Sequence, residues 1–541
     1  MQLHKSKEPA VFTQAGARKL MQVSGQANAA AAKQDWSEAA KLWQTLTDEF
    51  GDRTPIEAWT GLSAALRRSG RYSQAEHIVN LGLKIYKNYI GLLMEYAEVA
   101  NARRDWPEAI KRWRSLIEKI DDKTRLVAAY SRLTTAYAQN SDYGEATATA
   151  TEGLKHNPNS TAINSVLAEI YSLKNDWPEA IKRWQGVIDK LSDKAPADAW
   201  VGLCKALRKG NQLDEAEKSA KNGLLKFPVS LGLLIEDAEV ANARRDWPEA
   251  IKRWQAVLEF AAGRPEFDIS KRIYTRANLS FLKRIVGIGE YKAEISKHAK
   301  DHVKRDVAVY TSFTKGYDWL KLPETIDPRL DYIAFVDGAV NSHGIFDIRP
   351  LNQPDFENDG ARATRYPKTH PHILLKDYKV AIWMDTSLML VGDIMPMIED
   401  FLKSDKPIGS ATHPSRQSLT EEFEACIDLK KDDPAILKKQ AAFYRSVGFE
   451  TNDLSNNGLL FFNLEHPELP QALEIWWDQI CTFSKRDQLS FNYSLSKAGV
   501  ERYRLTNSPA DIRDHPNFVF TPHHTEIGVA NDLSKLLAKV S

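Results

Sequence analysis

Apolar and polar positions in the first half of the chain repeat with the period of an amphipathic helix. In residues 162–174, for example, apolar side chains recur every three or four positions, as they do on one face of an α-helix. Seven such stretches are each followed by a second helical stretch, which begins at a large side chain and has an alanine three positions later. The seven large side chains are 34 to 37 positions apart: Trp36, Tyr72, Trp106, Tyr143, Trp177, Leu213 and Trp247. The pattern predicts seven helix–turn–helix units.

Three of the seven units are nearly identical in sequence. RRDWPEAIKRW begins at Arg103 and again at Arg244, and KNDWPEAIKRW begins at Lys174. The Asp in each motif is a preferred N-cap residue, and the Pro lies in the first helical turn, where its missing N–H costs nothing. The period and the spacing from the large residue to the alanine resemble the tetratricopeptide repeat. The resemblance implies an all-helical solenoid that binds a protein partner or an acceptor.

Large and small residues alternate between successive units. Odd-numbered units have a second Trp seven positions after the first large residue: Trp43, Trp113, Trp184 and Trp254. Even-numbered units have Val79, Ala150 and Ala220 there, and a glycine late in the second helix at Gly82, Gly153 and Gly223. We expect the tryptophans to fill the core between units, with bulky and small surfaces interlocking over a period of two repeats.

Paired basic residues recur in the three near-identical units. They are Lys111-Arg112, Lys182-Arg183 and Lys252-Arg253. Two interpretations are open: a solvated helix face, and a basic ladder that binds an acidic partner. We favour the solvated face, because charges beside buried tryptophans usually lie in water.

After Arg305 the pattern changes to short runs rich in β-branched and aromatic residues. The runs begin at Asp306, Asp331, Lys379, Lys406 and Asn456. Helical stretches separate them, so we predict a mostly parallel α/β sheet. The predicted order is an N-terminal segment over residues 1–30, the solenoid over 31–268, capping or linking helices over 269–300, the α/β domain over 301–530 and a tail over 531–541.

Composition limits the functions that the chain can have. Lys and Arg number 73 against 72 Asp and Glu, so no strong positive field favours nucleic acid. The cysteines Cys204, Cys426 and Cys481 form no CxxC pair, which argues against a disulfide framework and a cysteine zinc site. No apolar run approaches the roughly 20 residues that span a bilayer, and the first residues lack a signal-peptide core. We expect a cytoplasmic protein, with peripheral attachment to the inner face of a membrane left open.

Polar residues stand where the predicted strands end. Ligands of parallel sheets bind beyond the carboxyl ends of the strands, so these residues are the first candidates for a site. They are Tyr310 and Thr311 after the first strand, Asp337 after the second, Asp385 after the third, His413 and Arg416 after the fourth, and Asn457 and Gly458 at the start of the fifth.

Four motifs in this half occur in the order of a known family. RYPKTHPHILLKDYKVAIWMDTSLMLVGD begins at Arg365, ATHPSR at Ala411, NNGLLFFN at Asn456 and KRDQLSF at Lys485. Together they resemble the glycosyltransferase-like family known as domain of unknown function 616, which is related to plant mucilage-associated transferases. The resemblance covers residues 301–527. It implies a GT-A fold and a nucleoside diphosphate sugar as the donor.

The resemblance makes Asp385 the main candidate for binding the donor sugar or a metal. The usual Asp-x-Asp signature reads Asp-Thr-Ser here, so the second carboxylate is missing and dependence on Mn²⁺ or Mg²⁺ is open. Asp393, His523 or His524 would have to complete a metal site.

Basic residues upstream of Asp385 are candidates for binding the donor. Arg365 and Lys368 can clamp a diphosphate, and His372 follows closely; a loop whose basic residues face water is the alternative. Asp337 either binds the nucleoside or only caps its strand.

Asp487 is our candidate for a catalytic or acceptor-orienting carboxylate, because glycosyl transfer needs a base or a group facing the anomeric carbon. A surface helix residue is the alternative. The resemblance also assigns His413, Arg416 and Asn457 to the sugar or acceptor pocket.

These candidates predict a glycosyltransferase that acts on a glycan or glycoconjugate, as in surface polysaccharide synthesis, with the repeats binding the acceptor or a partner. The rival hypothesis is a noncatalytic adaptor whose degenerate domain only senses nucleotide sugar, and the missing carboxylate supports it. A hydrolase is disfavoured, because the chain has no G-x-S-x-G, H-E-x-x-H or P-loop motif.

Overall fold

The structure is a computed structural model that describes residues 14–262, 264, 269–301, 303, 305–314, 318–351, 356, 359–506, 512–521 and 527–538. The chain divides into two compact units, Met1–Ser219 and Ala220–Ser541. The predicted order, a helical repeat solenoid followed by a mostly parallel α/β sheet, is confirmed.

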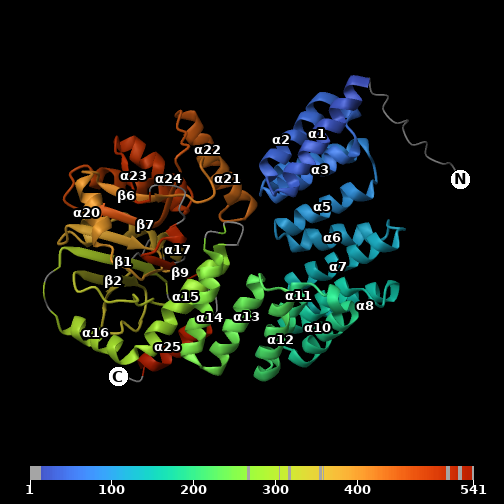
Figure 1. The fold of residues 1–541 in the computed structure, drawn as a ribbon. Helices are drawn as coiled ribbons and strands as arrows, with labels where there is room; N and C mark the ends of the chain where they lie inside the picture. The colour runs from blue at the N-terminus through green and yellow to red at the C-terminus, as the bar shows by residue number, and fades with distance from the viewer. Residues whose placement is uncertain are drawn as a thin grey trace. The chain divides into compact units, whose positions relative to one another are not determined.

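Helices follow one another in pairs through the first unit and into the second (Figure 1). Their bounds are α1 (Gln14–Ala32), α2 (Trp36–Phe50), α3 (Ile56–Arg68), α4 (Tyr72–Ile85), α5 (Ile90–Ala102), α6 (Trp106–Ile117), α7 (Lys123–Gln139), α8 (Tyr143–His156), α9 (Thr161–Leu173), α10 (Trp177–Leu191), α11 (Ala197–Lys209), α12 (Leu213–Lys226), α13 (Leu231–Arg244) and α14 (Trp247–Ala261). Each of the seven predicted large residues is the first residue of an even-numbered helix. The helical period and its anchors are therefore confirmed.

The start of each second helix follows from the motif. In α10, the Asp176 carboxylate accepts the Glu179 N–H at 3.3 Å, and Pro178 lies in the first turn. Asn175, just before the cap, has a φ of 57°, a left-handed conformation that Asn tolerates better than most residues. The turn and the cap together end one helix and begin the next within three residues.

The predicted interlocking of bulky and small residues is confirmed. A Cβ atom on Gly61 would lie 2.6 Å from the Trp43 ring, and one on Gly202 would lie 2.3 Å from the Trp184 ring. Gly153 of α8 has the same role, because its Cβ would lie 2.7 Å from Ile163. The four second tryptophans of the odd-numbered units are all buried. Glycine is thus required where a neighbouring bulky side chain fills the space.

The recurring basic residues of the repeats already have acidic partners. Arg112 forms ion pairs with Glu76 and Glu108 and lies 3.5 Å from the centre of the Tyr96 ring. In the seventh repeat, Arg253 pairs in the same way with Asp237 and Glu249. These contacts argue against a basic ladder, because each guanidinium is neutralised within its own part of the array. The neighbouring Lys111 and Lys252 lie on a solvated face, at 78% and 80% exposed, whereas the two arginines are 10% and 17% exposed.

The seventh repeat shares a hydrophobic core with the C-terminal domain. Helix α15 (Ile269–Val286) follows α14 and leads into α16 (Ile288–Lys300). One buried cluster contains Trp254 of α14, Phe281 of α15, Met389 and Val519 of the C-terminal domain, and Leu533 of α25 (Gly528–Ala538). The compact unit therefore begins at Ala220, about 80 residues before the boundary that the sequence pattern suggests.

The C-terminal domain is built on a seven-stranded sheet of order β3-β2-β1-β4-β7-β6-β8. The strands are β1 (Val307–Phe313), β2 (Leu330–Val336), β3 (Phe346–Pro350), β4 (Val380–Met384), β6 (Ile408–Thr412), β7 (Ser455–Asn463) and β8 (Arg502–Arg504). Only β7 is antiparallel to its neighbours, while every other pair in the sheet is parallel. Strands β5 (Leu388–Leu390) and β9 (Phe518–Phe520) form a separate antiparallel pair.

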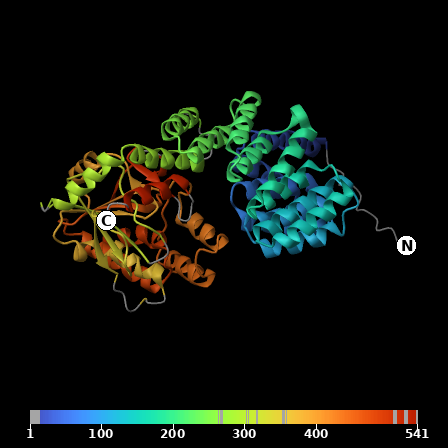
Figure 2. The ribbon, with the colours of Figure 1, turned by 90° about the horizontal axis from the view of Figure 1, so that it is seen from below.

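Helices cover both faces of the sheet, as an α/β sheet requires. Their bounds are α17 (Gly360–Ala363), α18 (Arg365–Thr369), α19 (Pro371–Leu374), α20 (Met395–Lys403), α21 (Leu419–Asp428), α22 (Pro434–Ser446), α23 (Leu469–Thr482) and α24 (Asp487–Ala498). One face packs against α23 and α24 through Trp476 and Phe491. The opposite face packs against α16 and α20 through Tyr291 and Phe401. Helix α15 lies beside β9 in both views (Figure 1 and Figure 2).

Candidate functional site

Two neighbouring strands bring the predicted site together at one edge of the sheet. Strand β4 ends at Met384, and Asp385 follows it. Because β7 runs antiparallel to β4, its first residues lie at the edge where β4 ends. The Asp385 N–H accordingly donates to the Gly458 carbonyl at 2.8 Å. A Cβ on Gly458 would lie 3.4 Å from an Asp385 carboxylate oxygen, which is an ordinary contact distance.

The Asp385 carboxylate is fixed from one side and open on the other. Its Oδ1 accepts the indole N–H of Trp383 at 2.7 Å and lies 3.6 Å from the ammonium group of Lys368. The side chain is 38% exposed. The carboxylate is therefore oriented by the protein and remains accessible to a ligand.

Lys368 and Asp487 form a buried ion pair behind Asp385. Their charged atoms are 2.6 Å apart, and both side chains are under 10% exposed. Arg365 lies three residues earlier on α18, so it shares a helix face with Lys368. Its Nε is 3.1 Å from the other Asp487 oxygen, although the angle leaves this N–H without a hydrogen-bond partner in the described part of the chain.

Asp487 is held in its charged form. Burial alone would raise the pKa of this carboxyl, but the nearby charges of Lys368 and Arg365 and the Lys368 hydrogen bond outweigh burial, and the pKa lies well below its usual range. Asp487 is also the first residue of α24, where a helix favours a negative charge. A carboxylate of this kind has little tendency to accept a proton near neutral pH.

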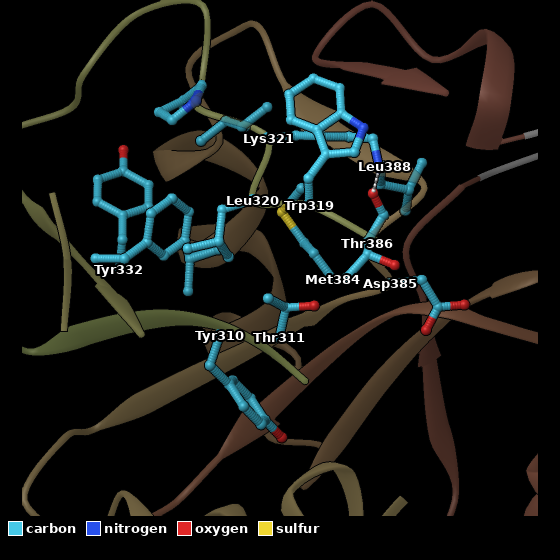
Figure 3. Close-up of a pocket in the computed structure, with 14 residues that line it drawn as sticks. Tyr310, Thr311, Trp319, Leu320, Lys321, Tyr332, Met384, Asp385, Thr386 and Leu388 are labelled. Carbon is cyan, nitrogen blue, oxygen red and sulfur yellow. Dashed lines mark hydrogen bonds between the residues drawn. The ribbon is translucent and has the colours of Figure 1, made fainter. Parts of the chain in front are cut away.

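Tyr310 supports this network from the hydrophobic core. Its hydroxyl donates to the Lys368 carbonyl at 3.4 Å, and its ring packs edge-on against Trp383. Burial raises the pKa of this hydroxyl well above its usual value. The ring points away from Trp319 and Thr386 (Figure 3). Tyr310 therefore lies on the core side of β1, because successive side chains of a strand point to opposite faces, and its predicted contact with the donor stays a prediction.

A polar cavity of about 140 Å³ opens beside Asp385. It is lined by the end of β1, by α17 and by Arg365, Trp383 and Thr386. The hydroxyl group of Ser312, which lines this cavity, is buried and has no hydrogen-bond partner among the described residues. Buried polar groups are rarely left unpaired, so this hydroxyl indicates a polar ligand.

A smaller apolar cavity lies beneath the loop that follows Asp385 (Figure 3). Its volume of about 40 Å³ is less than a third of that of the polar cavity. Beside it, the Lys321 ammonium bonds to the Thr386 carbonyl and pairs with Asp318 at 2.9 Å. Burial lowers the pKa of Lys321, although Asp318 acts in the opposite direction. This cavity is a packing gap, and Lys321 fixes the loop above it.

Sequence reasoning did not single out Trp319 or Lys321. They lie on a connection without regular secondary structure, and no motif marks them. Trp319 is 47% exposed, and the Lys321 ammonium lies 5.1 Å from the centre of its ring. The signal that marks these two residues is an exposed tryptophan beside a cavity. This signal is visible in the structure, where the loop lies against Asp385, and not in the sequence.

His413 and Arg416 form a separate cluster after β6. The His413 Nδ1 accepts the Arg416 N–H at 2.9 Å, and the Arg416 guanidinium pairs with the buried Glu422. Burial and the charge of Glu422 raise the pKa of Cys426 to about 11. Neither His413 nor Arg416 lines the two cavities at Asp385. Their contacts are those of a structured turn.

The other predicted residues differ in their relation to Asp385. Asn457 is buried beside Gly458, and its Nδ2 has no partner among the described residues. Asp337 is exposed at the end of β2. His372 lies on α19 and contacts Glu474 of α23 at 3.1 Å, and burial lowers its pKa. Of these three residues, Asn457 alone stands next to a residue with a described contact to Asp385, because the Gly458 carbonyl accepts the Asp385 N–H.

Two segments of the chain match models of known protein families. Residues 333–507 match the model of the TOD1/MUCI70 glycosyltransferase-like domain, and residues 25–89 match a tetratricopeptide repeat model. The first match includes Arg365, Lys368, Asp385 and Asp487 and confirms the resemblance that the motifs carry. The chain joins tetratricopeptide repeats to a glycosyltransferase-like domain. No curated protein matches the chain.

Several solved structures are similar to part of the chain. One is that of Cut9–Hcn1 from the APC/C, at 15% identity, 42% of this chain, 44% of that chain and a TM-score of 0.34. A tetratricopeptide repeat protein from Parabacteroides merdae has 13% identity, 46% and 95% coverage and a TM-score of 0.37. PilW, a type IV pilus biogenesis factor, has 16% identity, 41% and 98% coverage and a TM-score of 0.34. The chain thus spans less than half of the matched Cut9–Hcn1 chain.

The described part of the glycosyltransferase-like domain does not complete a metal site at Asp385. The Oδ1 of Asp385 is already bonded to Trp383 and faces a lysine, and Asp393 pairs with Arg329 and caps α20. No group of three His, Cys, Asp or Glu side chains that fits a metal ion occurs among the described residues. The predicted ligand His523, with His524, lies outside them.

Within the described ranges, no helix has both the length and the apolar character needed to cross a membrane.

Proposed function

We propose that the C-terminal domain transfers a sugar from a nucleoside diphosphate sugar to a glycan or glycoconjugate acceptor. The observation that carries the proposal is the network of Arg365, Lys368, Asp385 and Asp487 beside a polar cavity. It combines an oriented, accessible carboxylate with two cations at the carboxyl-terminal edge of the sheet, where α/β folds bind ligands.

The charges suit a leaving group that becomes more negative as the reaction proceeds. When the acceptor hydroxyl attacks the anomeric carbon, the bond from that carbon to the diphosphate oxygen breaks and the diphosphate leaves with the electron pair. The proton of the hydroxyl passes to an oxygen of the departing diphosphate. Arg365 lines the cavity, and guanidinium groups bind phosphate oxygens well. We assign to Arg365, assisted by Lys368, the neutralisation of the diphosphate.

Asp385 and Asp487 have different roles in this proposal. Asp385 is accessible and orients a sugar hydroxyl of the donor or acceptor. Asp487 is buried, paired and strongly acidic, so we assign it the positioning of Lys368 and Arg365 and not the removal of the acceptor's proton. Its predicted catalytic role thus becomes an indirect one.

No step of the proposal requires a metal ion, because the described donor atoms at Asp385 do not fit one and two cations are already present. The predicted Mn²⁺ or Mg²⁺ site with His523 remains open to direct test. We further propose that the repeats bind a protein partner or the acceptor, and that the protein acts on a surface polysaccharide at the cytoplasmic side of a membrane.

The adaptor hypothesis is the second candidate function. It is favoured by the single carboxylate of Asp-Thr-Ser and by the depressed pKa of Asp487, which leaves the described network without an evident base. In this case the domain binds the donor and does not turn it over.

Binding and turnover by the full-length protein would test the proposal. Calorimetric titration with uridine, guanosine, thymidine and adenosine diphosphate sugars, each with Mn²⁺ and with EDTA, should identify one donor that binds in both conditions. Arg365→Ala should weaken binding about 10- to 100-fold, which corresponds to one charged hydrogen bond. The control Arg349→Ala removes a cation from the edge strand β3, where it pairs with Asp347 and donates to the Leu374 carbonyl, and should leave binding unchanged.

Slow release of the sugar, abolished by Asp385→Asn without loss of donor binding, would support a transferase. Donor binding without any release would favour the adaptor. Absence of binding across the panel would contradict both hypotheses, and binding that EDTA abolishes would show that the cations alone do not neutralise the diphosphate.

A further inference from the structure

We propose that Arg276, on helix α15, is a positioning residue for Asp385. Helix α15 directly follows the seventh repeat, and it lies outside the segment that matches the glycosyltransferase-like domain. The proposal rests on the proposed function, because it concerns the loop that carries Asp385. It adds that α15, the helix that follows the repeats, helps to hold this loop in place.

Arg276 donates to the main chain of the segment before β9. Its Nη2 lies 2.6 Å from the His515 carbonyl oxygen and 2.8 Å from that of Phe518, and its Nη1 lies 3.3 Å from that of Arg513. An ion pair with Asp514 at 3.8 Å adds to these bonds, and the side chain is 13% exposed. A longer bond joins Nη2 to the Pro516 carbonyl at 3.4 Å. One guanidinium thus contacts four carbonyls between Arg513 and Phe518, the first residue of β9, which its planar set of five donors permits.

Strand β9 in turn holds the loop after Asp385. It pairs antiparallel with β5, which begins three residues after Asp385, so that Leu388 lies opposite Phe520 and Leu390 opposite Phe518. Beyond the pair, the Thr521 N–H donates to the Ser387 carbonyl at 2.6 Å. A continuous set of bonds therefore runs from Arg276 through β9 and β5 to Ser387.

The start of the loop is bonded back to Asp385 itself. The Leu388 N–H donates to the Asp385 carbonyl at 2.8 Å, and the Val391 N–H donates to the Asn517 carbonyl at 2.9 Å. The loop is short and bonded at both ends, so a displacement of β9 changes the position of the Asp385 main chain.

Helix α15 supports the same loop at a second point. Arg284 donates to the Leu322 carbonyl at 2.8 Å and lies 3.1 Å from the Met389 sulfur. Lys321, next to Leu322, bonds to the Thr386 carbonyl. Phe281 and Met389 share a buried cluster. The loop is therefore held between β9 and the 320–322 segment, and α15 contacts both.

Hydrogen–deuterium exchange of the ligand-free full-length protein would test the positioning role. The reporters are the amides of Leu388, Val391 and Thr521, which bond within the loop and β9. Arg276→Ala should raise their exchange rates at least tenfold, while amides of the β1–β2 pair stay protected. The control Lys283→Ala lies on the same helix, and its ammonium group pairs with the Glu324 carboxylate. The bond of Glu324 to the Leu390 carbonyl comes from the main chain and is kept, so this variant should leave the reporters unchanged.

Donor binding provides the second measurement. Arg276→Ala should weaken the binding of the donor found in the panel above at least tenfold, and Arg276→Lys should restore part of both effects, because a lysine can donate to some of the same carbonyls. Unchanged reporter amides in Arg276→Ala would overturn the proposal. An equal rise of exchange throughout the domain would also overturn it, since that result denotes general destabilisation. In that case the folded Arg276→Lys variant gives a second measurement of the exchange rates of the reporter amides.

The two proposals can fail separately. If no nucleotide sugar binds the unaltered protein, the proposed function is contradicted, while the exchange rates in Arg276→Ala still decide whether Arg276 holds the Asp385 loop.

Discussion

The ammonium group of Lys368 lies 2.6 Å from a carboxylate oxygen of Asp487, and both side chains are buried. The lysine also faces Asp385 at 3.6 Å. One buried charge thus connects the start of α24 with the end of β4, two segments separated by about 100 residues. The consequences of this pair for stability and for pH dependence can both be measured.

Asp487→Asn should destabilise the protein by about 3–5 kcal/mol, because removing one partner of a buried pair leaves the other charge uncompensated. Urea denaturation followed by circular dichroism would measure the loss. The control Asp306→Asn removes one partner of an exposed pair with Lys379, where stability should hardly change. A similar small effect at both positions would show that Lys368 finds another partner or loses its charge.

The stability of the protein should fall in acid partly through Asp487. Its pKa in the folded protein lies below the value of about 3.9 in an unfolded chain, so the unfolded state binds the proton first. The stabilisation is fully present above that unfolded value and declines as the pH falls below it. Denaturation between pH 5 and pH 2.5 should show a shallower decline in Asp487→Asn than in the unaltered protein; identical slopes would contradict the assignment.

Two glycines of the solenoid should respond in opposite directions to alanine. Gly202→Ala places a methyl group 2.3 Å from the Trp184 ring, and such overpacking costs about 1–3 kcal/mol, which exceeds the gain in helix propensity. The matched control is Gly186→Ala on α10, where nothing lies within 4 Å, and the gain of about 1 kcal/mol should appear alone. Thermal denaturation of both variants would detect the difference in sign.

The repeat array could be predicted closely from the sequence because its packing is local. A large residue, an alanine three positions later and an N-cap Asp fix where each second helix begins, and Trp106, Trp177 and Trp247 all stand at that point. The alternation also pointed to Gly82 and Gly153, but not to Gly61 and Gly202, which lie against Trp43 and Trp184. What the pattern did not indicate is that the seventh repeat shares a core with Val519 and Leu533, because those contacts join residues more than 250 positions apart.

The residues of the candidate site that stand in sequence motifs could be predicted from the sequence. Arg365, Lys368, Asp385 and Asp487 come together as a network, and all four stand in recognisable motifs. That Tyr310 lies on the core side of β1 could not be predicted, because the end of a strand does not reveal the face to which a side chain points. Lys321 was missed, since its position depends on how a loop folds against Thr386. Residues without a motif are found only when distant segments are placed in space.

The core that the last repeat shares with α25 and the Asp385 loop constrains how the repeat array can change in evolution. Upstream pairs can be duplicated, lost or exchanged for pairs with another binding preference, as long as each new unit matches its neighbours. The terminal pair α13–α14 has no such freedom, since its inner surface is complementary to one particular enzyme-like domain. Variation in array length should therefore accumulate toward the amino terminus, and designed fusions that graft a new array onto this domain should retain every residue from α13 onward.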